Sequence, residues 1–296
     1  VEGEWIYLGG DVAATTFATN KGFARIGAIT STYIEFDKIG WTGQIAEVGT
    51  GKTIRIFFGS VLKNENNPSL IKRRTLQLER TLGNDGNGTQ SEYLVGAVAN
   101  EFTLNVAQAD KVTADFTFIA LDNEQRTGTQ GVKSGNRPTL VSGSAFNTSS
   151  DVTRIKLSAV STTNPTPTPL FAFATEMNIG VKNNVSPNKA VGVLGAFDTS
   201  TGNFEVSGSM TAYFADVTAV QAVRNNADIT IDVIMQKKNS ALVWDIPLLS
   251  LGNGRLAVEQ DQPITLPLDT MGAESRFGHT LMFVSFSYLP DVAGGV

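Results

Sequence analysis

The chain has 296 residues, of which 41% are hydrophobic and 17% are charged, so it can bury a substantial core. Its formal net charge of −5 argues against a grip on nucleic-acid phosphates, which needs an excess of basic residues. It contains no cysteine and one histidine, His279, which excludes disulfides, thiolate or multi-histidine metal sites and most hydrolytic catalysis. Neither a membrane-spanning stretch nor a signal peptide is visible. We therefore expect a protein that is not an enzyme and holds no cofactor and no metal.

Alternation of apolar and polar residues predicts β-strands throughout the first half of the chain. The expected strands there are residues 53–58, 75–81, 101–106 and 112–119. The last two flank a turn-like segment and predict a β-hairpin with one buried face. Phe102, Phe116 and Phe118 lie on that face and are expected in the core.

The second half repeats the alternation. The expected strands are residues 202–214, 229–236, 241–249 and 281–289. Phe204 and Phe214 fall on the apolar face of the first of these and are also expected in the core. Helical signals are few: residues 217–225, with Asp216 as the N-cap, and a second short helix within residues 59–64. The predicted fold class is all-β with one or two short helices.

A polar stretch divides the chain. Residues 142–169 are rich in Ser, Thr, Asn and Pro, a composition that resists regular structure and indicates an exposed linker or loop. It separates a first β half, residues 1–141 with an extended N-terminal region, from a second, residues 170–296. Each half carries a hairpin with an aromatic-rich alternating strand, so a duplicated fold is an open possibility.

Three motifs suggest chemistry and are better explained by structure. Residues 46–53 fit a relaxed phosphate-binding loop, but a β-branched strand follows where a helix is needed and Glu47 lies inside the loop. Residues 83–88 resemble part of a calcium loop but supply one carboxylate, Asp85, and lack the closing glutamate. His279 has no nucleophile motif to serve. We interpret these motifs as a turn, a polar loop and a structural histidine.

The basic cluster Lys72, Arg73 and Arg74 stands beside an expected strand. Three adjacent charges can meet phosphate, but they more often face solvent or the acidic groups of a neighbouring subunit. We expect these residues, together with Glu79, to lie at an interface between subunits.

The order and spacing of the strand motifs resemble those of tail tube (major tail) proteins of long-tailed bacteriophages. The resemblance is carried by residues 76–81 (LQLERT), 93–106 (YLVGAVANEFTLNV) and 112–118 (VTADFTF). In the second half it is carried by residues 190–198 (AVGVLGAFD) and 202–214 (GNFEVSGSMTAYF). The N-terminal region and the polar stretch 142–169 depart from the family pattern.

This resemblance implies a β-sandwich or partly closed barrel that assembles into stacked rings around a channel, a structural part of the virion built in the host cytoplasm. A duplicated fold would give pseudo-six-fold rings of three copies, which we favour, and a single fold would give six. The implied partners are further copies, a tape-measure protein, a tail terminator, distal tail proteins and, transiently, double-stranded DNA in the lumen. An acidic channel lining would repel that DNA. Residues 38–53 and 64–74 are the loops expected to reach a neighbouring ring.

Other functions remain open on the sequence. A non-catalytic β-sandwich module or adhesin for carbohydrate would share the composition and would use Trp5, Trp41 or Trp244 in a shallow groove. A capsid-decorating protein would differ only in how it assembles. A nucleotide-binding enzyme would be supported only by nucleotide binding to the purified chain.

Overall fold

The computed structural model describes residues 1–9, 17–41, 46–139, 143, 145–161, 163–171, 173–214 and 217–290. Within these residues the fold is all-β, with one α-helix, α1 (Thr218–Arg224), and one turn of 3-10 helix at Gly128–Gln130. The strands are β1 (Trp5–Gly9), β2 (Gly22–Ile29), β3 (Ile34–Ile39), β4 (Arg55–Phe58), β5 (Ser60–Lys63), β6 (Leu76–Asn84), β7 (Thr89–Ala107), β8 (Thr113–Ile119), β9 (Asp122–Arg126), β10 (Val152–Ala159), β11 (Ala174–Lys182), β12 (Ser186–Asn188), β13 (Asp198–Ser200), β14 (Glu205–Tyr213), β15 (Ile229–Lys237), β16 (Ser240–Asn253), β17 (Thr265–Gly272) and β18 (Met282–Phe286).

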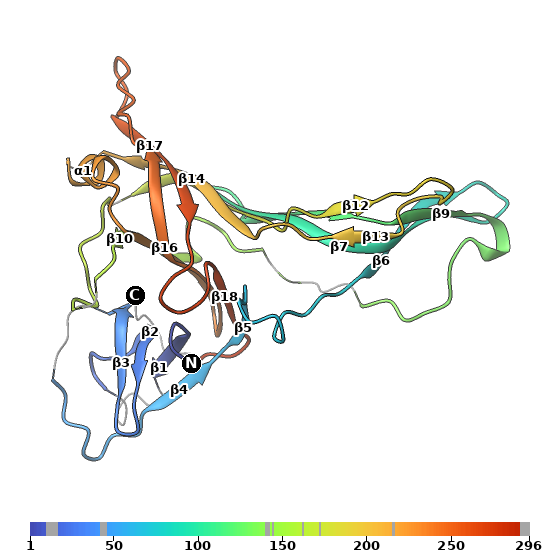
Figure 1. Ribbon diagram of the computed structural model, residues 1–296. Coiled ribbons are helices and arrows are strands. Elements are labelled where there is room, and N and C mark those ends of the chain that lie inside the picture. The colour runs from blue at the N-terminus through green and yellow to red at the C-terminus, as the bar shows by residue number, and fades with distance from the viewer. Residues whose placement is uncertain are drawn as a thin grey trace.

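The strands form a layered body and a long arm that projects from it (Figure 1). The body has three layers, of which two, called here the central and flanking sheets, are parts of one continuous sheet. The N-terminal sheet has the order β3-β2-β1-β4, the central sheet the order β10-β15-β16-β18-β5, and the flanking sheet the order β17-β14-β11-β7-β8. Strand β16 joins the last two, because its first part pairs with β15 and β18 and its end pairs with β17.

The central sheet is buried on both faces, and β15 shows why. Its odd-numbered residues, including Ile231 and Val233, pack into the main core against the flanking sheet. Its even-numbered residues face the N-terminal sheet, where Ile234 joins a second core with Trp5 and Phe286. Because both faces are covered, residues on both sides of the strand are buried, including the polar Thr230 and Asp232 on the side of the N-terminal sheet.

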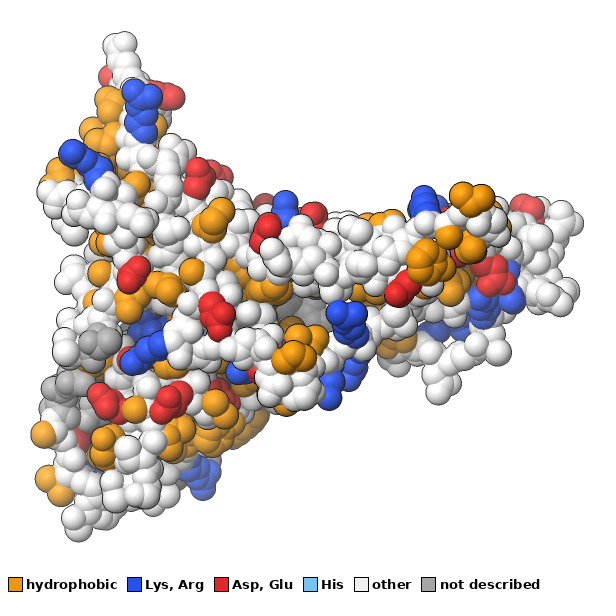
Figure 2. Space-filling view, in the orientation of Figure 1, with side chains coloured by type: hydrophobic (Ala, Val, Ile, Leu, Met, Phe, Trp, Pro, Cys, Tyr) orange, Lys and Arg blue, Asp and Glu red, His pale blue; other side chains and the backbone are white. Residues whose placement is uncertain are grey.

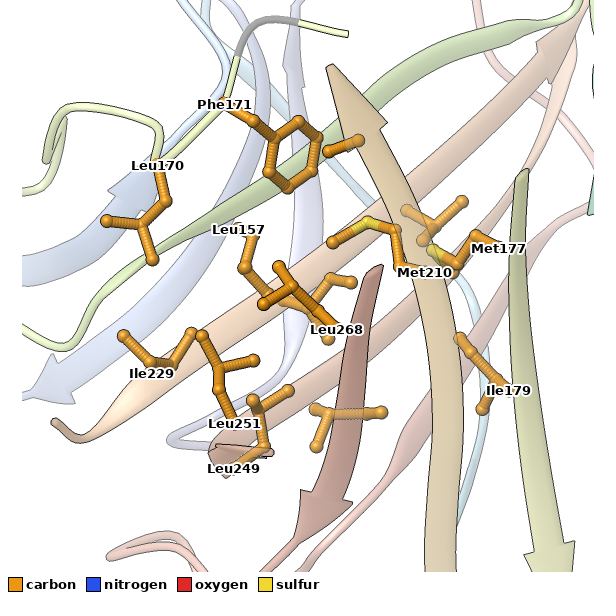
Figure 3. Packing of buried hydrophobic residues seen from close by; sticks show 14 of the residues in the cluster. Leu157, Leu170, Phe171, Met177, Ile179, Met210, Ile229, Leu249, Leu251 and Leu268 are labelled. Atoms are coloured by element: carbon orange, nitrogen blue, oxygen red, sulfur yellow. The ribbon is translucent and has the colours of Figure 1, made fainter. Parts of the chain in front are cut away.

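The main core lies between the central and flanking sheets. Figure 3 shows side chains from both sheets meeting there, among them Leu157, Met177, Met210 and Leu268. Cross-strand pairs such as Met177 with Met210 and Met210 with Leu268 place these side chains on one face of the flanking sheet. This continuous apolar layer is the largest stabilising feature of the body.

Buried charges also join the N-terminal sheet to the central sheet. The Asp232 carboxylate is fully buried, forms an ion pair with Lys38, and accepts a 3.2 Å hydrogen bond from Arg154. Arg25 binds Asp37 at 2.9 Å and Asp245 at 3.1 Å. Buried pairs add little net stability, but they are costly to leave half-made, so they favour one way of docking the two sheets.

The arm is built on the long strand β7. Its first half pairs with β6 on one side and β9 on the other, and its second half belongs to the flanking sheet. Gly96 lies where the two halves meet, with φ of 63°, and a Cβ there would approach Leu121 to 2.6 Å. Glycine fits this left-handed, crowded position at the base of the arm. The two-stranded sheet β12-β13 lies along the arm (Figure 1).

Several sequence predictions are confirmed and others are wrong. The hairpin, the strands of the second half and helix α1 are present, while Asp216, its expected N-cap, lies outside the described residues. Residues 60–63 form strand β5 and not a helix. The stretch 142–169 is not simply a linker, because β10 within it pairs with β15 and buries Leu157 in the core. The division into two halves stays a prediction, although strands from both halves share the flanking sheet.

Candidate assembly surfaces

One face of the flanking sheet packs into the core and the other is polar; we call the second the polar face. Its residues stand in rows across the paired strands. One row is Thr113, Asn105, Asn178, Ser209 and Asp269, in which each residue is the cross-strand partner of the next. The neighbouring rows are Asp115, Thr103, Gly180, Ser207 and Met271 on one side, and Thr117, Glu101, Lys182 and Glu205 beyond it. The register therefore builds a face of hydroxyls, amides and carboxylates.

The polar face is acidic, and its side chains bind one another. In these rows and in the adjacent Glu176, five carboxylates accompany a single basic residue, Lys182. Asn178 Nδ2 donates to Ser209 Oγ at 2.7 Å, and Thr211 Oγ1 donates to Glu176 Oε1 at 3.0 Å. Such a surface is negatively charged, and several of its side chains are held by hydrogen bonds to one another. It should therefore repel phosphate groups and not bind them.

Ion pairs organise the arm. Glu79 accepts hydrogen bonds from Arg137 and from the Tyr93 hydroxyl, the latter at 2.7 Å, and these bonds lower the pKa of Glu79 to about 2. The Tyr93 oxygen also accepts a 2.7 Å bond from the Lys133 backbone amide, and its ring lies under the Lys133 ammonium. The segment after the 3-10 turn is therefore fastened to β6 and β7 within one chain.

The arm also exposes large apolar side chains. They lie on β6 (Leu76, Leu82), on β7 (Val95), after the 3-10 turn (Val132) and between β12 and β13 (Val191, Val193, Leu194, Phe197). Figure 2 shows one such orange group near the far end of the arm. Monomeric proteins rarely leave clusters of this kind uncovered, so the arm has the character of an interaction element.

The predicted interface residues fall in two different settings. Lys72, Arg73 and Arg74 are exposed in the segment between β5 and β6, where Arg73 donates a 3.2 Å hydrogen bond to Thr201. Glu79 is engaged by Arg137 within its own chain. The assignment of all four residues to an interface therefore stays a prediction, and Glu79 in addition has a structural role in the arm.

The predicted core phenylalanines separate in the same way. Phe102 and Phe204 are half-buried and pack against the main core. Phe118 and Phe214 are also half-buried, but Phe116 is 61% exposed, so its assignment to the core is wrong for the single chain. Its ring points to the core side beside Phe102, at 5.0 Å between centroids, yet β8 is an edge strand on which no other described strand pairs. The alternation predicted the face correctly and could not reveal the edge.

The motifs that suggested chemistry are structural in the described residues. The Glu47 carboxylate is held by backbone amides of residues 18–20, which lower its pKa, and strand β4 follows the glycine turn. Asp85 accepts bonds from the Asn87 amide and the Gln90 side chain. His279 is fully buried beside Phe277. Among the described residues, no group of three His, Cys, Asp or Glu side chains could hold a metal ion.

The three tryptophans do not form an exposed groove. Trp5 is fully buried between the N-terminal and central sheets. Trp41 is half-buried against Phe36, and Trp244 stacks on Phe102 at 5.1 Å. The arrangement expected for a carbohydrate-binding module is therefore not formed by these residues.

A family model described as phage tail tube protein matches residues 4–272. The chain belongs to the phage tail tube protein family. It is a structural tail tube subunit and a virion component, and it self-assembles into a tube with other tail proteins. No match was found among curated proteins. In the described part of this tail tube protein, no helix is long and apolar enough to cross a membrane. The all-β architecture agrees with the family, although the described strands do not close into a barrel within one chain.

Proposed function

We propose that the polar face of the flanking sheet lines the channel of the tail tube, and that the subunit polymerises as stacked rings to conduct double-stranded DNA during ejection. The observation that carries this proposal is the acidic character of the cross-strand rows. A DNA conduit must confine a polyanion without binding it, and one basic residue among five carboxylates meets that need.

The layer order supports the same orientation. The polar face is the only broad side of the flanking sheet left uncovered within the described body, since its other side packs into the main core. The N-terminal sheet lies beyond the central sheet, on the opposite side of the body (Figure 1). Placing the polar face inward therefore places the N-terminal sheet on the outside of the tube.

The ring is proposed to contain six copies, or three if the fold is duplicated. The shared flanking sheet favours six copies over the three expected from the sequence, because strands β7 and β8 of the first half and β11 and β14 of the second are neighbours in one sheet. The tape-measure, terminator and distal tail proteins are the proposed partners at the two ends of the tube. We further propose that subunits assemble in the host cytoplasm and that the tube itself carries out no catalysis.

The absence of cysteine makes a direct test possible. A cysteine at Ser209, in the centre of the polar face, and one at Thr32, exposed beyond β2, would each be labelled in assembled tubes with a heavy-atom maleimide. Electron microscopy of the tubes should show Ser209→Cys density inside the bore and Thr32→Cys density outside it. The rotational symmetry of the same images reports the number of copies in each ring.

Two outcomes would count against the proposal. Label at Ser209 on the outer wall would reverse the orientation while leaving the family assignment intact. Failure of the unmodified protein to form tubes or rings at any concentration, with or without a tail initiator, would remove the conduit function itself.

A further inference from the structure

One methionine of the chain is exposed, and it lies on the polar face. The chain has five methionines, and four of them are buried in the cores, none more than 4% exposed: Met177, Met210, Met235 and Met282. Met271, near the end of β17, is 66% exposed. Because the sequence contains no cysteine, the thioether of Met271 is the one sulfur of the chain that solvent reaches freely.

The register of the flanking sheet explains this exposure. Leu268 of β17 packs into the main core, so the alternation of the strand places Asp269 and Met271 on the opposite, polar face. The main core therefore cannot cover the Met271 side chain, and any cover would have to come from its neighbours on the polar face.

Those neighbours have short side chains or none. The cross-strand partners of Met271 are Ser207 on β14 and Ser250 on β16, and the partner of Ser207 on β11 is Gly180. Gly252 and Met271 line the same open hollow in the face. None of these residues is long enough to enclose the sulfur, so a small molecule can approach it from the open side of the sheet.

An exposed thioether reacts with peroxides. A lone pair of the sulfur attacks one peroxide oxygen, the O–O bond breaks, and the sulfur keeps the oxygen as a sulfoxide. With hydrogen peroxide, the hydroxyl that leaves takes up the remaining proton and departs as water, so the sulfur is oxidised while the peroxide is reduced. The carboxylates of the polar face, including Asp269, repel anionic oxidants but not a neutral peroxide.

We propose that Met271 is a modification site at which small neutral peroxides oxidise the chain, and that the assembled tube tolerates the sulfoxide. The inference rests on the proposed function, because the polar face must stay open to solvent in the tube, as it does when it lines the bore. A sulfoxide is polar and disrupts a methionine that is packed in a core. On the polar face it points into solvent and disturbs no packed neighbour.

Mass spectrometry of peroxide-treated protein tests the site. Monomers and assembled tubes would be treated with dilute hydrogen peroxide at neutral pH, quenched and digested, and the sulfoxide fraction of each methionine peptide followed with time. Met271 should be converted in both samples while the four buried methionines stay unmodified. Met271→Leu, which keeps an apolar side chain of similar size, should show no sulfoxide after the same treatment. Treated wild-type tubes should look unchanged in electron micrographs.

Three results would overturn the inference. The first is oxidation of a buried methionine, such as Met210, before Met271. The second is oxidation of Met271 in the monomer but not in tubes, because assembly would then cover this part of the polar face. The third is the loss of treated wild-type tubes under conditions in which Met271→Leu tubes survive. A wild-type chain that forms no tubes would count against the proposed function, and the monomer sample would still decide whether Met271 is the reactive site.

Discussion

The body and the arm of this tail tube protein differ in how far their side chains are buried. In the body, the central sheet is covered on both faces and even its charges are enclosed, as Asp232 and Lys38 show. In the arm, Tyr93 and Ala97 are buried, but β6 is exposed along almost its whole length. The body therefore contains the interactions that a monomer needs in order to fold.

The arm holds its shape mainly by backbone pairing and ion pairs, and most of its large aliphatic side chains are exposed in the single chain. The stability of the monomer should therefore depend on the body, and assembly of the tube on the arm. Changes in the body should lower the free energy of unfolding of the monomer. Changes on the arm surface should leave the monomer folded and alter the tube.

The strongest test of the body is removal of its buried carboxylate. Asp232→Ala would leave Lys38 and Arg154 without their shared partner in a buried site. We expect the free energy of unfolding to fall by about 3–5 kcal/mol, because an uncompensated buried charge is expensive. Urea unfolding of the monomer measures the loss. Asp122→Ala, at an exposed carboxylate of the arm, is the matched control and should change stability by less than about 0.5 kcal/mol. Equal effects of the two would erase the contrast between the regions.

Two leucine substitutions test the same contrast between body and arm without changing the charge of the protein. Leu268→Ala removes a side chain that is 1% exposed in the main core and should cost roughly 2–5 kcal/mol of unfolding free energy. Leu194→Ala, in the exposed loop between β12 and β13, should leave the thermal melt of the monomer unchanged and weaken tube growth. A melting shift for Leu194→Ala as large as that for Leu268→Ala would show that the arm is part of the cooperative core.

These contrasts also show what the sequence could predict. Alternation identified β14, β15 and β16 and the correct face of Phe116, because side-chain direction follows from local backbone geometry. It missed β10, whose Val152, Ile155 and Leu157 stand within a Ser-, Thr- and Pro-rich stretch that dominated the composition. Partners distant in the chain leave no local signal: Lys38 and Asp232 are 194 residues apart. The exposed apolar residues between β12 and β13 were recognised only as part of a family motif, since exposure depends on the tertiary fold.

The single histidine gives the body a dependence on pH. Burial lowers the pKa of His279 below its ordinary value near 6.5. The unfolded chain therefore takes up a proton at a higher pH than the folded chain, and the stability present at neutral pH is lost as the pH falls through and below that value. The loss should not exceed about 1.4 kcal/mol per pH unit from this group. Unfolding of wild type and His279→Gln, compared from pH 7.5 to pH 5, isolates the contribution. Parallel curves for the two proteins would show that His279 does not titrate on unfolding.

The smallest expected effect lies in the arm, and it should be local. Tyr93→Phe keeps the buried ring and removes the hydroxyl that binds Glu79 and the Lys133 amide. We expect about 1 kcal/mol of local destabilisation, because the amide loses its partner while Arg137 still holds Glu79.

The melting temperature of the whole protein should barely change, because the core that holds the body together is not touched by this substitution. Hydrogen exchange of residues 131–137 should speed up about fivefold, the factor that about 1 kcal/mol implies. Tyr33→Phe, at an exposed tyrosine before β3, is the control and should leave those residues unchanged. If Tyr93→Phe instead lowers the global melting temperature, the arm unfolds together with the body, and its exposed apolar surface has to be read as part of one cooperative unit.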